Sequence, residues 1–131
     1  MAYLLDTCIF IDLMKGSPAV QDRIAEAGLN NCFCCDIVLA ELYVGPLKTR
    51  STLHLKQADW IAQKFPALSF RESYKTYARI RAFQENQGTR LDNMDMLIAS
   101  IALDHDLTMI TRNRKHFERI PGLQVEDWFT E

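Results

Sequence analysis

The chain has 131 residues, a length that suits one compact domain over residues 1–131 with an apolar core of its own. Apolar residues make up 48% of it and charged residues 24%, a balance that excludes a disordered or fibrous protein. The formal net charge of −2 argues against a protein that coats nucleic acid by bulk positive charge, although it permits a nuclease that neutralises phosphate with a bound metal.

The first half of the chain alternates short apolar runs with stretches of helical periodicity. The predicted elements are, in chain order, a strand over 3–5, a short helix over 9–15, a helix from 17 to 28, a strand over 31–35, a helix from 36 to 46 and a helix over 49–65. Ser17 followed by Pro18 is a typical helix start, and Gly28 is a typical end. Asp36 is placed to cap the helix that stops at the Gly45-Pro46 pair.

The second half continues the same alternation. It predicts a strand over 67–70, a helix over 71–87, a helix that Asp92 caps and that runs to 104, a strand over 107–111 and a strand over 123–125. Strands separated by helices indicate a mostly parallel sheet, because a parallel connection needs a crossover of about a dozen residues. The predicted fold is therefore α/β, with about five strands and helices on both faces of the sheet.

Compartment and cysteine chemistry can also be predicted. No apolar run approaches the roughly 18 to 20 residues that span a bilayer, and the N-terminus reaches Asp6 before a signal-like core can form. We therefore expect a cytoplasmic protein without membrane segments. Three of the four cysteines, Cys32, Cys34 and Cys35, fall in a predicted buried strand, and we interpret all four, Cys8 included, as free thiols that pack as small apolar side chains.

Two acids follow strand ends or helix starts, where parallel sheets collect ligands. Asp6 comes between a buried strand and an apolar helix, so its carboxylate needs helix N–H groups, a cation or water around it. Asp95 lies one turn into its helix, with Asp92 before it. The structural alternatives are that Asp6 only caps its helix and that Asp95 only complements the helix dipole. For Asp92, capping is the preferred interpretation.

Glu41 has an unusual setting on its predicted helix. Its neighbours at helical spacing are Ile37, Val38, Val44 and Gly45, which places it in an apolar stripe. A buried lone carboxylate is strongly destabilising unless it is protonated, paired or bound to a metal. The alternative is a surface glutamate on a helix whose apolar face is broad.

The combination of three acids is stronger evidence for a site than each acid alone, because Asp6, Glu41 and Asp95 all fall near the edge where ligands of an α/β sheet bind. Carboxylates brought close together cannot all stay ionised without a cation between them. Oxygen ligands select Mg²⁺ or Mn²⁺, which can activate water and clamp a phosphoryl group. The pattern therefore predicts metal-dependent hydrolysis of a phosphodiester.

A polar and basic segment follows the predicted strand over 107–111. It reads Thr111-Arg112-Asn113-Arg114-Lys115-His116, with Arg119 close behind. Such groups at a strand end could hold a phosphate near the metal site, and the alternative is an exposed, solvated loop.

Four segments in order resemble the PIN-domain family and, within it, the VapC-type toxins. They are Leu4-Leu5-Asp6-Thr7, the segment 37–45 around Glu41, Asp95-Met96-Leu97-Ile98-Ala99-Ser100, and the C-terminal Ile110-Thr111-Arg112-Asn113 with Phe117, Ile120-Pro121-Gly122-Leu123 and Glu126-Asp127-Trp128. Each motif is weak alone, but the match spans nearly the whole chain in register.

The resemblance implies an RNA endonuclease with Mg²⁺, or Mn²⁺ in its place, held by Asp6, Glu41 and Asp95, and a cognate VapB-type antitoxin that keeps the toxin inactive. Candidate supporting or substrate contacts are Thr7, Asp92, Thr111, Arg112 and Asn113. Two positions depart from the family pattern: Cys8 stands where Asn is usual, and His116 stands where an acid is often present. The second departure predicts a weaker second metal site.

Two other functions were weighed. A two-component receiver domain has a similar fold and metal chemistry, but it needs an acid after the third strand and a Lys after the fifth, and Phe70-Arg71 and no such Lys occur here. A catalytically inactive PIN-like module that binds RNA or protein is the alternative that remains. The sequence does not name the RNA that is cut.

Partner surfaces are predicted from apolar residues outside the expected site. These are Phe10, Ile11, Leu13, Leu55, Trp60 and Ile61. If some of them are exposed as a groove, they suit an amphipathic antitoxin helix. We also expect a homodimer or a larger toxin–antitoxin assembly.

Overall fold

The computed structural model describes residues 1–129, which contain a five-stranded sheet with the strand order β3-β2-β1-β4-β5. The strands are β1 (Tyr3–Leu5), β2 (Cys32–Cys35), β3 (Ala67–Leu68), β4 (Thr108–Ile110) and β5 (Val125–Glu126). Every neighbouring pair is parallel. The predicted α/β class and strand count are therefore confirmed.

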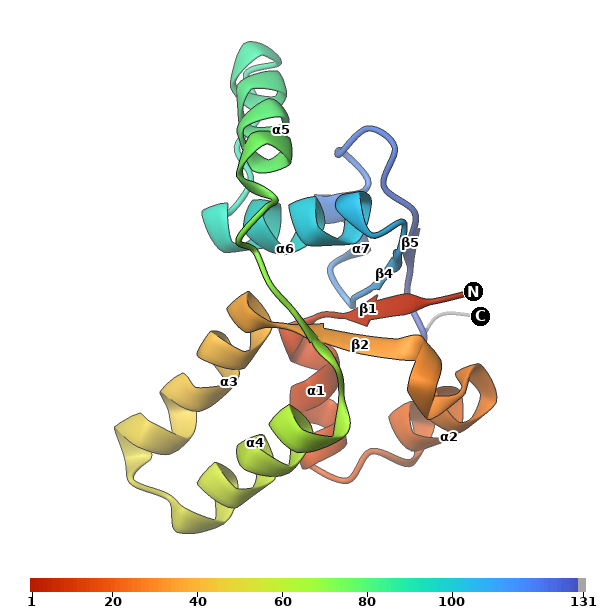
Figure 1. Ribbon diagram of the computed structural model, residues 1–131, viewed down its shortest axis with the longest axis vertical. Helices are drawn as coiled ribbons and strands as arrows, with labels where there is room; N and C mark the ends of the chain where they lie inside the picture. The colour runs from red at the N-terminus through yellow and green to blue at the C-terminus, as the bar shows by residue number, and fades with distance from the viewer. Residues whose placement is uncertain (130–131) are drawn as a thin grey trace.

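Helices cover both faces of this sheet. They are α1 (Thr7–Met14), α2 (Pro18–Ala27), α3 (Asp36–Thr49), α4 (Thr52–Lys64), α5 (Tyr74–Asn86), α6 (Asn93–Asp104) and α7 (Arg114–Phe117), with a short 3₁₀ turn η1 (Leu29–Asn31). Figure 1 shows α1 to α4 below the strands and α5 to α7 above them. None of the helices within residues 1–129 is long and apolar enough to cross a membrane.

The central strands β1 and β4 form the middle of the core. Leu4 and Leu5 on β1 and Met109 and Ile110 on β4 are fully buried, because helices shield both faces of a parallel sheet. Three of the four cysteines are buried in β2 and all four are free thiols, as predicted. The apolar character of these short strands thus reflects burial from two sides.

The strand order places a ligand site between β1 and β4. The chain runs from β1 to β2 and β3 on one side and then crosses to β4 on the other side of β1. A crevice outside the carboxyl ends of the strands forms at such a switch in direction. The register pairs Leu5 with Ile110, and the Asp6 N–H donates to the Ile110 carbonyl at 2.9 Å, so Asp6 lies beside Thr111.

The end of α3 differs from the sequence prediction. The helix continues through Gly45-Pro46 to Thr49 and ends where Arg50 adopts a left-handed conformation with φ of 56°. Val38, Leu42 and Pro46, four residues apart, are the buried residues of α3. Packing of the Pro46 ring therefore extends a helix that Gly-Pro was predicted to stop, and Ser51 caps α4 by accepting the His54 N–H at 3.2 Å.

Other local predictions also need correction. Asp36 does not cap α3 with its side chain; it is the first helical residue, and its carboxylate accepts the Phe70 N–H at 3.0 Å, which ties α3 to the segment after β3. The helix predicted from 71 starts at Tyr74. The one-turn elements η1 and α7 were missed because so short a helix carries no periodicity.

Candidate active site

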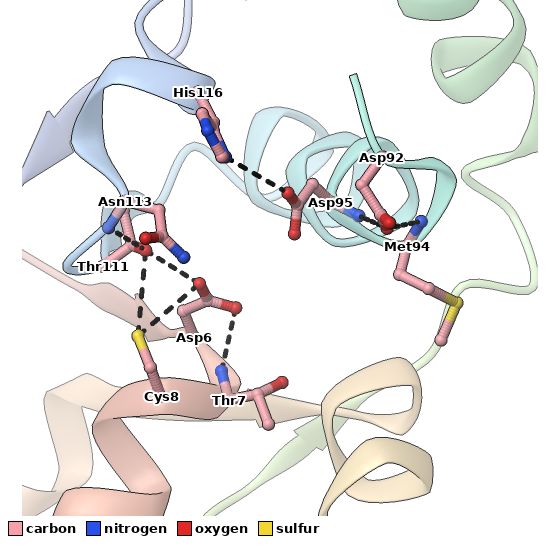
Figure 2. Close-up of polar contacts among 9 residues, drawn as sticks. All are labelled: Asp6, Thr7, Cys8, Asp92, Met94, Asp95, Thr111, Asn113 and His116. Atoms are coloured by element: carbon pink, nitrogen blue, oxygen red, sulfur yellow. Dashed lines mark hydrogen bonds and ion pairs between the residues drawn. The ribbon is translucent and has the colours of Figure 1, made fainter. Parts of the chain in front are cut away.

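Asp6 is the most firmly held acid of the site. Its Oδ1 accepts the Thr7 N–H at 2.8 Å and its Oδ2 accepts the Thr111 hydroxyl at 2.8 Å. The residue is 5% exposed, and this burial raises the pKa of its carboxyl, against the opposing effect of these hydrogen bonds. Asp6 therefore caps α1, as one of the two interpretations held, and its carboxylate lies at the end of β1 beside Thr111 (Figure 2).

Thr111 anchors the other side of Asp6. It is fully buried at the end of β4, and its oxygen donates to Asp6 while accepting the Asn113 N–H at 3.0 Å. The Cys8 thiol lies 3.8 Å from Asp6 Oδ2 and 3.9 Å from the Thr111 hydroxyl. Asp6 Oδ2 is thus enclosed by groups of β4 and α1, and its orientation is fixed before any ligand arrives.

Glu41 is joined to Asp6 through one residue. The Thr7 hydroxyl donates to Glu41 Oε1 at 2.7 Å, while the Thr7 N–H donates to Asp6. Glu41 is half-buried at the edge of the buried stripe of α3, and its neighbour Val44 is 61% exposed. The prediction that Glu41 lies within an apolar stripe is therefore wrong. The buried face of α3 runs through Val38, Leu42 and Pro46, and Glu41 lies beside this face.

Asp95 has a different environment on α6. Asp92 caps this helix, as predicted, by accepting the Met94 N–H at 2.8 Å and the Asp95 N–H at 3.4 Å. Burial first, and then the charges of Asp6, Asp92 and Glu41, raise the pKa of Asp95 to about 7. Within residues 1–129 no N–H or O–H donates to its carboxylate; the His116 ring nitrogen Nδ1 lies 4.0 Å from its Oδ2.

The structure brings the three predicted acids to one edge of the sheet. Figure 2 shows Asp6 and Asp95 facing the space between α1 and α6, and the charges of Asp6 and Glu41 both act on Asp95. Over the described range 1–129, no three Asp, Glu, His or Cys groups are already closed around a common point. Repulsion among the ionised carboxylates opposes a closer approach of the three acids.

The donor set suits a hard divalent cation. Three carboxylates provide oxygen ligands of the kind that Mg²⁺ and Mn²⁺ prefer. A cation would offset both the burial and the neighbouring charges that raise the pKa of Asp95. Asp6, Glu41 and Asp95 are the residues that would hold it. The fit is one of charge and chemistry, at the sheet edge where ligands of α/β proteins collect.

The predicted supporting contacts divide into two groups. Thr7 and Thr111 bond to the acids, and Figure 2 places the Asn113 side chain next to Thr111 and Asp6. Arg112 lies between the Cys8 side of the site and Asp12: it interacts with the Cys8 thiol, its Nε lies 3.4 Å from Asp12 Oδ2, and its guanidinium lies 5.8 Å from the centre of the Phe129 ring. A contact of Arg112 with substrate stays a prediction.

Sequence reasoning did not predict three contacts of the site, although it named Cys8 and His116 as departures from the family pattern. They are the thiol of Cys8 against Asp6, the ring of His116 opposite Asp95, and the half-buried Asp12 side chain that pairs with Arg112. Asp12 could have been found, since it interrupts the apolar run from Ile9 to Met14. The other two depend on contacts between elements that are distant in the chain.

Apolar hollows lie on the α1, α3 and α4 side of the fold. One of about 310 Å³ is lined by Ile11, Met14, Leu42 and Pro46 among others, and one of about 270 Å³ is lined by Leu13, Met14, Trp60 and Ile61 with Gln21 and Gln57. Of the six residues predicted for a groove, Ile11 and Trp60 are exposed, Leu13 and Leu55 are half-buried, and Phe10 and Ile61 belong to the core. The prediction is therefore correct in part.

Comparisons with known proteins agree with this geometry. The model of the PIN-domain family matches residues 3–123. A protein named ribonuclease VapC2 of Rickettsia felis and a tRNA(fMet)-specific endonuclease VapC of Shigella flexneri are each 31% identical to the chain, and each match covers 98% of both sequences.

Solved structures show the same fold. The structure of VapBC2 from Rickettsia felis, bound to a DNA fragment from its promoter, has a TM-score of 0.87 and 29% identity over 98% of this chain and 99% of that chain. VapBC-1 from nontypeable Haemophilus influenzae has a TM-score of 0.87 and 30% identity over 99% of this chain and all of that chain.

Proposed function

Because this chain belongs to the PIN-domain family and, within it, to the VapC ribonucleases, we propose that it is a toxin that hydrolyses RNA with Mg²⁺ held by Asp6, Glu41 and Asp95. Mn²⁺ can take the place of Mg²⁺. The observation that carries the proposal is the state of Asp95, whose pKa rises to about 7 among three other acids while no donor bonds to its carboxylate. A divalent cation would offset the repulsion among these acids.

The chain's own residues divide the work of the site. A bound divalent ion supplies an activated water and neutralises charge on the phosphodiester. Thr111 holds Asp6 through Oδ2, and Thr7 fixes the relative positions of Asp6 and Glu41 by bonding to both. Asn113, whose N–H donates to Thr111, lies next to Asp6 and offers an amide to the substrate.

A cleavage assay with the purified chain tests the proposal. Initiator tRNA is the first substrate to try, since the Shigella relative is named for it. We expect cleavage with Mg²⁺ or Mn²⁺, none with excess EDTA, and none for Asp6→Asn. The matched control is Asp22→Asn, because Asp22 is an exposed acid on α2, away from the site.

The alternative function makes a different prediction in the same assay. An inactive PIN-like module would bind RNA in a gel-shift experiment but leave it intact at every metal concentration. Cleavage that survives excess EDTA would overturn the metal-dependent mechanism.

The proposed partner is a VapB-type antitoxin, and the neighbours crystallised as VapBC complexes motivate it. We place its apolar segment in the hollows between α1, α3 and α4, where Ile11 is 37% exposed and Trp60 is 47% exposed. Glu41 lines the first hollow, so a basic residue that follows the segment would reach the acidic site. Action in the cytoplasm and assembly into a homodimer or a larger complex remain part of the proposal.

The partner proposal has its own test. Ile11→Glu puts a charge into the hollow and should weaken binding of the antitoxin encoded beside this gene, measured by calorimetry. RNA cleavage by the free variant should largely persist, because Ile11 shares the hollow with Glu41 but its apolar side chain donates no hydrogen bond to the acids. Unchanged antitoxin affinity would move the partner to another surface.

A further inference from the structure

His116 lies opposite Asp95 at the outer limit of an ion pair, with no hydrogen bond between the two side chains. The ring projects from the one-turn helix α7, its side chain is 60% exposed, and its Nδ1 is 4.0 Å from Asp95 Oδ2. That distance is too long for a hydrogen bond. Within the described residues the imidazole makes no other polar contact, so both ring nitrogens are available to a ligand.

The spacing of the two groups suits a shared ion. Nitrogen and oxygen ligands bind divalent metals at about 2.1 Å, so two ligands of one ion lie about 3.0 Å apart at right angles and about 4.2 Å apart when opposite. The observed 4.0 Å between Asp95 and His116 falls inside this range. Figure 2 shows the His116 ring and the Asp95 carboxylate pointing toward each other.

We propose that His116 is a nitrogen ligand of the divalent ion that Asp95 binds, and that this ligand gives the site a preference for Mn²⁺ over Mg²⁺. The inference rests on the proposed function. Both ions bind oxygen ligands, but Mn²⁺ is a first-row transition metal and accepts an imidazole nitrogen more readily than Mg²⁺, which is bound through carboxylates, phosphates and water. A site with carboxylates on one side and His116 on the other therefore discriminates between two ions that three acids alone would treat more alike.

Pulsed electron paramagnetic resonance on the Mn²⁺-loaded protein tests the inference directly. Metal-free wild type is titrated with Mn²⁺, and the spin echo is examined for coupling to a directly bound imidazole nitrogen. We expect this coupling in the wild type and its loss in His116→Asn. The matched control is His54→Asn, since His54 is exposed on α4 and its ring makes no polar contact in the described structure.

Binding measurements give a second readout. His116→Asn should lower Mn²⁺ affinity about tenfold or more and change Mg²⁺ affinity little, because only the nitrogen ligand is lost. His116→Asp should reverse the preference, because it completes an oxygen-only ligand set. Circular dichroism checks that each variant is folded, as the exposure of His116 leads us to expect.

The outcomes separate the two proposals. Mn²⁺ binding without nitrogen coupling in the wild type overturns the role of His116 and leaves the acid site intact. In that case His116 lies near Asp95 but is not a ligand of the metal. Failure of the folded wild type to bind either ion overturns both the acid metal site and the role of His116.

Discussion

Asp6 and Asp95 lie on two sides of the candidate site, which we call the sheet wall and the helix wall, and the two sides are built differently. The sheet wall carries Asp6, which is 5% exposed and receives hydrogen bonds from Thr7 and Thr111. The helix wall carries Asp95, which receives none in the described structure and lies 4.0 Å from His116. Burial raises the pKa of both carboxyls, but in the described structure only the sheet wall supplies hydrogen bonds that oppose this effect.

The difference indicates which half of the site the fold forms by itself. The hydrogen bonds from Thr7 and Thr111 orient Asp6, so its geometry does not depend on a cation. Asp95 is held near other acids by the packing of α6, and its raised pKa records the free energy that this placement stores. One wall is preorganised, and the other becomes favourable only when a positive charge enters.

The largest expected effect comes from breaking the helix wall. Asp95→Asn keeps the shape of the side chain and removes a charged ligand, so RNA cleavage should fall at least about a hundredfold, since metal assistance supplies several kcal/mol of transition-state stabilisation. The assay is cleavage at saturating Mg²⁺, with Asp22→Asn as the control. Undiminished cleavage by the folded variant would restrict Asp95 to a structural role at the start of α6.

The next effect concerns the sheet wall. Thr111→Val keeps the volume but removes the donor to Asp6 Oδ2, and we expect a loss of about 10- to 100-fold in metal affinity or cleavage, the range typical when a group that orients a metal ligand is lost. Thr111→Ser keeps the hydroxyl and should retain most of both. If Val and Ser behave alike, the hydroxyl does not position Asp6.

A third prediction compares the walls through the pH dependence of stability in the metal-free protein. The pKa of folded Asp95 is about 7, whereas that of the unfolded chain is about 4, so between these values the folded state holds a proton that the unfolded state has lost. The contribution of Asp95 to stability therefore falls as pH rises from about 4 to about 7 and stays low above that.

Asp95→Asn removes this dependence. Urea unfolding at pH 8 in EDTA should show the variant more stable than wild type by about 1 to 2 kcal/mol, a value reduced for the solvent that reaches the side chain. At pH 4 the two proteins should differ little. A variant that is less stable at pH 8 would indicate that the Asp95 charge stabilises α6.

The smallest effect tests the support of the helix wall. Asp92→Ala removes the cap of α6 and should cost about 1 kcal/mol of stability in urea unfolding, while Asp92→Ser keeps a capping oxygen and should cost less. Removing the Asp92 charge also lowers the pKa of Asp95, so part of the loss is offset above pH 7. An equal loss for Ala and Ser would mean that the cap contributes little.

Sequence reasoning succeeded where chemistry follows from local order. Asp6 and Thr111 were placed at strand ends because each directly follows an apolar run, and parallel strands bring their ends to one edge. The Asp92 cap was found from its place before a periodic stretch. The fold class followed from the alternation of strands and helices, which is a property of the whole chain.

The errors have a common physical origin in contacts between distant segments. Gly45-Pro46 was predicted to stop α3, but packing of the Pro46 ring outweighs the missing N–H. Asp36 was predicted as a cap and instead binds the Phe70 N–H. In each case a tertiary partner decides the outcome, and periodicity does not report such partners.

The hydrogen bond between Thr111 and Asp6 has a consequence for when the proposed site can form during synthesis of the chain. It joins residues 105 positions apart, so the sheet wall cannot close on a chain that ends before β4. Proteins are made from the N-terminus at about 5 to 20 residues per second, and non-local strand pairs form late. A nascent chain would therefore carry Asp6 and Glu41 before Thr111 is in place, and the proposed nuclease site would be complete only when synthesis is nearly finished.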